Sequence, residues 1–231
     1  LLDRRGNVVA QSELIALQLG SITHTFRPCL KLYSLEEIGP DDFFINNDPF
    51  HGGQHLPDIF IFSPVFYEGE LVGFSATVVH HTDLGGGAPG LNPKAGDIHQ
   101  EGLVFPPTKY SLTRDWNGGG LERFIASNVR MPEATIGDLN AQFAANAIGA
   151  ERIRELCRKF DPNVVDTAMV EMLDYAERRI RSAIRSVPDG VYTGEAMIDD
   201  DGIGQEPVRI KATLTVSDDS IEVDFGGSDP Q

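Results

Sequence analysis

The sequence predicts an α+β protein, in which strands and helices occupy separate stretches of the chain. Residues 1–120 contain short apolar runs separated by turn residues, which is typical of strands joined by long loops. Over residues 121–188 the apolar residues recur every three or four positions, which indicates helices. Residues 189–231 return to two-residue alternation and predict a β-hairpin region. Because the strands precede the helices rather than alternating with them, a mixed α/β or α+β arrangement is favoured over a doubly wound parallel sheet.

Two segments of the first region have the composition of central strands. Residues 58–66 (DIFIFSPVF) and 71–79 (LVGFSATVV) are apolar at both odd and even positions, so we expect both strands to be buried on both faces. The opening residues 1–12 (LLDRRGNVVAQS) predict a strand, a turn at Gly6 and Asn7, and a second strand.

The central region predicts a helical hairpin or three helices. Pro162 suits the first turn of the second long helix, with Asp161 as its cap, and Pro188 follows its end. The expected apolar faces consist of Ile136, Leu139, Phe143, Ala147, Ile153, Leu156, Phe160, Val165, Met169, Met172, Ala176, Ile180 and Ile184.

Composition excludes several classes of partner. The chain has 231 residues, of which 41% are hydrophobic, enough to bury a core. Its 35 acidic and 19 basic residues give a formal charge of −16, which repels nucleic acid and anionic membrane surfaces. Cys29 and Cys157 form no CxxC motif, so we expect neither a disulfide framework nor a cysteine-rich zinc site, and a reducing cytoplasm as the location.

Coordinating side chains are concentrated in residues 47–58, NDPFHGGQHLPD. His51 and His55 are four residues apart and His55 and Asp58 are three apart, while the neighbouring glycines and prolines favour a tight loop over a long helix.

A second group, His80, His81 and Asp83, ends the predicted strand 71–79. Consecutive strand residues point to opposite faces, so only one of the two histidines is expected to reach the first group, and we take it to be His80. Together with His55 and Asp58 it would form a mixed nitrogen and oxygen set that suits Zn, Mn or Fe.

Other residues of these groups have open roles. Asp48, His51, His81 and Asp83 are candidates for a fourth ligand, for holding the ligands in place, or for proton transfer. The alternative is that these histidines only cap turns and satisfy buried backbone groups.

Candidates outside the two groups are weaker. His99 and Glu101 could reach the same cleft as an acid or base, although a solvated loop explains them as well. The three glycines at 118–120 could form an anion-binding helix start, or simply a loop. Neither GxSxG nor SxxK occurs, which disfavours covalent catalysis.

Four motifs occur in the same order as in a known family: GGQHLPDIFIFSPVF, HHTDLGGGAPG, IHQEGLVFPP and DFGGSDPQ. They resemble the hydantoinase B family, which includes the B subunit of ATP-dependent N-methylhydantoinase and the C-terminal part of 5-oxoprolinase, and more distantly the alpha subunits of acetone and acetophenone carboxylases. The resemblance covers essentially all 231 residues. Because family members are longer on both sides, it implies a fragment of a longer B-type chain.

The resemblance implies an ATP-dependent reaction shared between two components. An A-type ATPase partner would use ATP to phosphorylate a small cyclic amide, and the B-type component would complete its hydrolytic ring opening within a cytoplasmic hetero-oligomer. The metal ligands of the carboxylase members match His55, Asp58 and His80 of this sequence, and His81 or Asp83 could move protons beside such a metal. Carboxylation of a phosphorylated ketone is the alternative within the family, and a non-catalytic assembly module is the alternative of another class.

Overall fold

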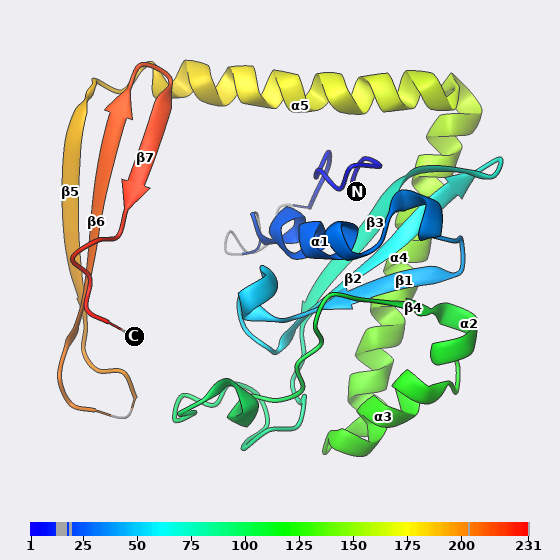
Figure 1. Ribbon diagram of the computed structural model, residues 1–231, viewed down its shortest axis with the longest axis horizontal. Coiled ribbons are helices and arrows are strands. Elements are labelled where there is room, and N and C mark those ends of the chain that lie inside the picture. Colours follow the sequence, from blue (N-terminus) through cyan, green and yellow to red (C-terminus); the bar gives the residue numbers. More distant parts are fainter. Residues whose placement is uncertain (13–17, 19, 203, 231) are drawn as a thin grey trace. The chain divides into compact units, whose positions relative to one another are not determined.

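The computed structural model describes residues 1–12, 18, 20–202 and 204–230. The chain forms two compact units, Leu1–Met169 and Val170–Gln231, and helices and antiparallel sheets occupy separate stretches of it (Figure 1). The predicted α+β class is therefore confirmed.

The larger unit is built on a four-stranded antiparallel sheet of order β3-β2-β1-β4. Its strands are β1 (Asp42–Asn46), β2 (Asp58–Tyr67), β3 (Glu70–His80) and β4 (Thr108–Ser111). Glu68 and Gly69, with φ of 50° and 88°, join β2 to β3 in a two-residue turn whose left-handed conformations match the twist of a hairpin. This hairpin pairs Asp58, the first residue of β2, with His80, the last residue of β3.

Helices cover both faces of this sheet (Figure 1). The helices of the unit are α1 (Ser21–Leu32), α2 (Leu112–Asp115), α3 (Gly120–Asn128), α4 (Pro132–Phe160) and the start of α5 (Pro162–Ile184), with single 3-10 turns η2 (Leu35–Glu37), η3 (Pro49–His51) and η4 (Ile98–Gln100). Ile59 and Ile61 of β2 pack with Leu139 of α4, whereas Phe60 and Phe62 point to the other face and pack with Phe26 of α1. The rings of Phe26 and Phe62 stack with centroids 4.3 Å apart.

Burial of the two long strands differs from the expectation in one case. Seven of the ten residues of β2 are buried, so the predicted burial on both faces is confirmed for this strand. The prediction is wrong for β3, in which only 73–75 are buried, because β3 is an edge strand of the sheet.

Helix α1 lies in the first region, where the sequence indicated strands and loops. Its N-cap, Gly20, makes no side-chain capping bond, and Pro28 lies inside the helix, so the usual start and continuation signals are missing. The helix is held by tertiary contacts, since Thr25, Phe26 and Cys29 are buried against the sheet.

The long helices begin and end close to where the sequence places them. Asp161 precedes α5 and its Oδ1 accepts a hydrogen bond from the backbone N–H of Asn163 (2.8 Å). The buried face of α4 includes two amides, Gln142 and Asn146, whereas Ala147 of the expected apolar face is exposed. These amides hydrogen-bond to carbonyl oxygens of β2, which explains how polar residues can face the sheet.

The smaller unit contains the later part of α5 and a three-stranded antiparallel sheet of order β5-β6-β7. Its strands are β5 (Gly190–Ile198), β6 (Val208–Ser217) and β7 (Ser220–Asp224). Asp218 and Asp219 form the turn between β6 and β7. Ion pairs from Arg181 and Arg185 to Asp219 connect the C-terminal end of α5 to the turn between β6 and β7.

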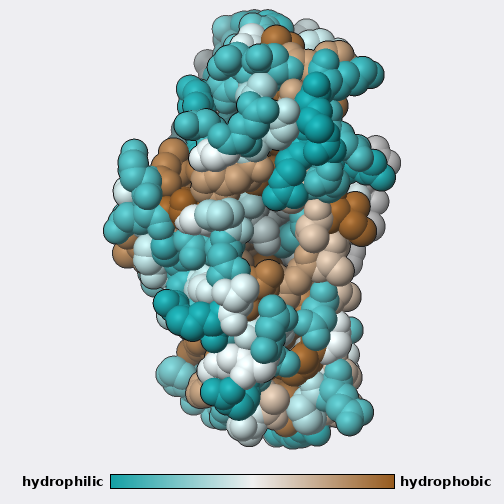
Figure 2. Space-filling view, turned by 90° about the vertical axis from the view of Figure 1, so that its right-hand side faces the viewer, coloured by the Kyte–Doolittle hydropathy of each residue, from teal (hydrophilic) through white to brown (hydrophobic). Residues whose placement is uncertain are grey.

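Apolar side chains also reach the surface. Figure 2 shows brown patches between hydrophilic areas on the face that it draws. Among the helices of the described chain, none combines the length and hydrophobicity needed to cross a bilayer.

Candidate metal centre

The loop between β1 and β2 is fixed from both sides. Asn47 is fully buried and donates to the carbonyl oxygens of Leu56 (2.7 Å) and Leu103 (2.9 Å). Gly52 has φ of 95° and approaches α1 so closely that an added Cβ would lie 2.5 Å from the carbonyl oxygen of His24. This loop is tight, as the glycines and prolines of the sequence indicate, and it leads directly into Asp58.

Three of the expected site residues converge on one point. His55 Nδ1 lies 3.2 Å from Asp58 Oδ2, and His80 Nδ1 lies 3.1 Å from Asp58 Oδ1. One candidate ligand atom from each residue lies within 4.8 Å of the other two. The loop supplies His55, while the β2–β3 pairing brings His80 opposite Asp58 although they are 22 residues apart.

The donor set suits a divalent cation. Asp58 is 2% exposed, and a buried carboxylate needs a positive counterpart. Nδ1 of His55 is buried, lies 3.2 Å from Asp58 Oδ2 and has no hydrogen-bond partner among the described residues, so it is a candidate ligand atom for a cation. Two imidazole nitrogens and one carboxylate oxygen are ligands that Zn, Mn and Fe accept.

Gln18 adds a contact that sequence spacing did not indicate. Its Nε2 donates to Asp58 Oδ2, and its Oε1 accepts from the hydroxyl of Ser21 (2.8 Å). Such an amide fixes the orientation of a ligand carboxylate. Gln18 is 40 residues from Asp58, and no motif links them.

His81 points to the other face of β3 and is 1% exposed. Gln142 Nε2 donates to the carbonyl oxygen of Ile59 (3.0 Å), so its Oε1 faces His81 Nε2 at 3.0 Å, and the hydrogen-bond network assigns the proton of the neutral ring to Nε2. His81 Nδ1 then carries a lone pair, and it is buried with no partner among the described residues. Burial lowers the pKa of His81, which keeps the ring neutral near pH 7.

Asp83 is engaged by the segment that begins α4. Its carboxylate accepts from the backbone N–H groups of Gly85 (3.1 Å), Arg130 and Met131 (3.0 Å), and pairs with the Arg130 guanidinium (3.1 Å). Burial would raise the pKa of Asp83, but these hydrogen bonds outweigh it and lower the pKa. Its oxygens are therefore committed to holding the loop after β3.

The remaining candidates lie outside the cluster of ligand atoms. His51 Nδ1 pairs with Asp48 Oδ2 at 2.7 Å, and Asp48 also accepts from the backbone N–H of Phe50. His99 and Glu101 lie in and just after η4, where His99 is exposed.

The fold and this cluster define a class: an α+β protein that presents two histidines and an aspartate where a sheet hairpin meets a fixed loop. A protein-family model described as Hydantoinase B/oxoprolinase matches residues 1–231, and the chain belongs to this family. The resemblance drawn from the motifs is thereby confirmed.

Relatives include both lactam-cleaving and carboxylating enzymes. The chain is 34% identical to the caprolactamase subunit beta of Pseudomonas jessenii, covering 96% of this chain and 38% of the relative. It is 30% identical to the acetophenone carboxylase delta subunit of Aromatoleum aromaticum, covering 97% and 34%. For that enzyme the matched subunit is delta, whereas the motifs suggested an alpha subunit.

A solved structure shares the fold. The ATP-dependent caprolactamase from Pseudomonas jessenii superposes with a TM-score of 0.84 at 32% identity, covering 96% of this chain and 38% of that one. The chain spans between about one fifth and two fifths of the length of the curated relatives that it matches.

Proposed function

We propose that this chain is the B-type component of an ATP-dependent cyclic-amide hydrolase. It would complete the ring opening of a substrate that an A-type ATPase partner has phosphorylated, within a hetero-oligomer. The observation that carries the proposal is the convergence of His55, Asp58 and His80 within 4.8 Å in a chain of the hydantoinase B/oxoprolinase family. The likeness to a caprolactamase subunit favours a cyclic amide as the substrate.

These three residues would hold a divalent ion, Zn, Mn or Fe. When bound, such an ion supplies a lowered pKa for water and polarises a carbonyl group. Asp58 places its negative charge between the two imidazoles, and Gln18 keeps that carboxylate oriented through its hydrogen bond.

His81 would transfer protons. Its neutral ring would accept a proton at Nδ1 from the attacking water and return it to the ring nitrogen of the substrate as the C–N bond breaks. The acyl phosphate that this step leaves would then be hydrolysed by a second water, which releases inorganic phosphate. Gln142 keeps the accepting atom unprotonated beforehand by taking the Nε2–H. We assign this role to His81 rather than to Asp83, whose carboxylate is occupied by Arg130 and the neighbouring backbone.

A ketone carboxylase is the second candidate, favoured by the identity to the acetophenone carboxylase delta subunit. A non-catalytic assembly module would instead use the protein surface alone.

The buried, free thiols of Cys29 and Cys157 agree with a reducing cytoplasm as the location.

The test combines the protein with its ATPase partner. Hydantoin, 5-oxoproline, caprolactam, or a ketone with bicarbonate would be supplied in turn, and ATP consumption and product formation followed. We expect ring-opened product with a cyclic amide. Turnover of the ketone with bicarbonate, but of none of the cyclic amides, would contradict the proposal of a hydrolase. Partner binding without any turnover would identify an assembly module.

A further inference from the structure

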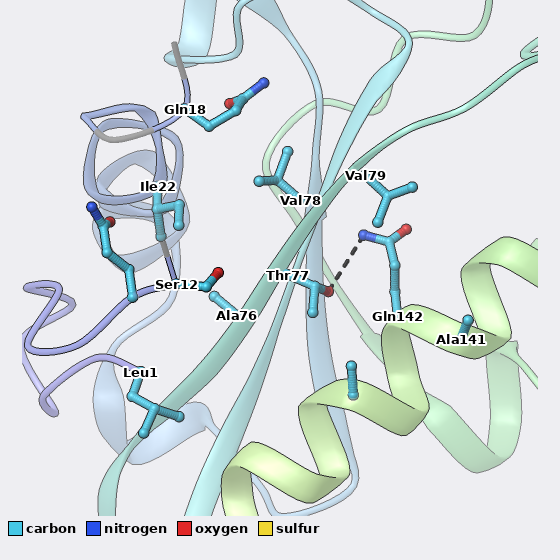
Figure 3. A pocket seen from close by; sticks show the side chains of 12 residues that line it. Leu1, Ser12, Gln18, Ile22, Ala76, Thr77, Val78, Val79, Ala141 and Gln142 are labelled. Carbon is cyan, nitrogen blue, oxygen red and sulfur yellow. Dashed lines mark hydrogen bonds between the residues drawn. The ribbon is translucent and has the colours of Figure 1, made fainter. Parts of the chain in front are cut away.

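A hollow of about 380 Å³ lies along the outer edge of β3, between the α1 side and α4 (Figure 3). Residues 76–79 of β3 form its floor, while Ile22 and Gln18 line one side and Gln142 the other. Its size falls within the range of ~300–1,000 Å³ that is usual for small-molecule sites.

The walls of this hollow are shared with the candidate metal centre. Gln18 lines the hollow and donates to Asp58, and Gln142 lines it and holds His81. The floor of the hollow, residues 76–79, runs directly into His80. A ring that occupied the hollow would therefore contact Gln18 and Gln142, the two residues that hold Asp58 and His81.

The lining is apolar with a few neutral polar groups. Among the described lining residues no side chain carries a charge, and aliphatic side chains such as Ile22, Val78 and Val79 predominate. Both ends of the Gln18 and Gln142 amides are already hydrogen-bonded within the protein. The structure does not describe residues 13–17 and 19. In the sequence they are Glu, Leu, Ile, Ala, Leu and Leu, so this part of the sequence contains no basic residue.

Such a lining discriminates between rings by charge. A carboxylate that entered the hollow would lose hydration without meeting a cationic side chain among the described lining residues, which is costly, whereas methylene groups gain from leaving water. We propose that this hollow receives the hydrocarbon side of the cyclic amide and selects uncharged rings over rings that bear a carboxylate. This inference rests on the proposed function, and it adds a substrate class that the metal centre alone does not define.

Two probes test the selection directly: pyrrolidinone and 5-oxoproline, which share one five-membered lactam ring and differ by the carboxylate. Each would be titrated into the protein while the methyl NMR signals of Ile22, Val78 and Val79 are followed. We expect pyrrolidinone to shift these signals with an affinity at least about ten-fold higher than that of 5-oxoproline.

Variants at two neighbouring exposed alanines of α4 locate the site. Ala145 lines the hollow and Ala144 does not, so both can be replaced without disturbing a buried position. Ala145→Phe should weaken pyrrolidinone binding by about ten-fold or more, and Ala144→Phe should leave it unchanged. Ala145→Arg should bring the affinity for 5-oxoproline up to that for pyrrolidinone, since it supplies the missing cation, with Ala144→Arg as its control.

Equal or tighter binding of 5-oxoproline to the unaltered protein would overturn the inference. So would the absence of methyl shifts with both probes, or equal effects of Ala145→Phe and Ala144→Phe. These results are distinct from failure of the proposed function, because the NMR titration requires neither ATP nor turnover. Preferential pyrrolidinone binding without hydrolysis of any cyclic amide would retain the hollow and reject the hydrolase.

Discussion

His80 and His81 are adjacent in the chain, yet β3 separates their environments. His80 turns to Asp58 on one face, where it adds a third candidate ligand, and His81 turns to Gln142 on the other, where it is buried. The two residues therefore have different roles, because successive side chains of a strand point in opposite directions.

Replacing His81 should affect the reaction without affecting the metal. His81→Ala should lower ATP-dependent turnover by about 10²–10⁴-fold, the usual contribution of a general base. Steady-state ATP and product assays with the partner would measure this, and His51→Ala serves as the control because His51 pairs with Asp48 outside the cluster. An unchanged rate, or loss of bound metal in His81→Ala, would contradict the assigned role.

Replacing Asp83 should affect stability, with a defined pH dependence. Asp83→Asn removes charge-assisted hydrogen bonds at a buried site and should lower the free energy of unfolding by about 2–4 kcal/mol at neutral pH. Because the folded protein lowers the pKa of Asp83, its stabilisation is present above about 3.9, the ordinary value, and is lost as pH falls through the folded pKa. Denaturant unfolding at several pH values would measure this, and a difference between wild type and variant that persists at full strength in strong acid would refute it.

At the scale of elements, α4 approaches the sheet closely at Gly149. A Cβ there would lie 2.2 Å from Ser75 Oγ and 3.1 Å from a methyl carbon of Leu1. Gly149→Ala should therefore destabilise the protein by about 1–3 kcal/mol. Gly137 lies in the same helix with nothing within 4 Å, so Gly137→Ala should stabilise by about 0.5–1 kcal/mol. Chemical denaturation of both variants measures the contrast, and effects of equal sign would contradict this packing.

Elements with strong local signals could be predicted from the sequence, and those held by distant contacts could not. The continuous apolar run of β2 and the Asp161–Pro162 start of α5 are local patterns, and both occur as expected. Helix α1 has apolar residues at helical spacing, but Gly20 gives it no side-chain cap and Pro28 lies inside it. It depends on burial of Phe26 and Cys29 against strands that follow it in sequence.

The same distinction applies to the candidate site. His55 and Asp58 are three residues apart, and a histidine at a strand end is visible in the sequence, so the cluster could be anticipated. The contacts of Gln18 with Asp58 and of Gln142 with His81 span 40 and 61 residues and follow no motif. Such supporting residues become visible only when the chain is folded.

At the scale of the whole molecule, the candidate centre is a site for a cation within a chain of formal charge −16. Asp58 is buried between imidazoles rather than solvated with the surface acids, so a bound cation would stabilise the larger unit, Leu1–Met169, that contains the cluster.

The most direct test of the central claim is the metal content of the purified protein, measured by mass spectrometry after loading with Zn, Mn or Fe(II) and removal of free ion. We predict one tightly held ion per chain in the wild type and in His51→Ala, and its loss in Asp58→Asn and His80→Ala. Folding of each variant would be checked by circular dichroism. A wild-type protein that retains no ion, or folded variants that retain it fully, would contradict the claim that His55, Asp58 and His80 form a metal centre.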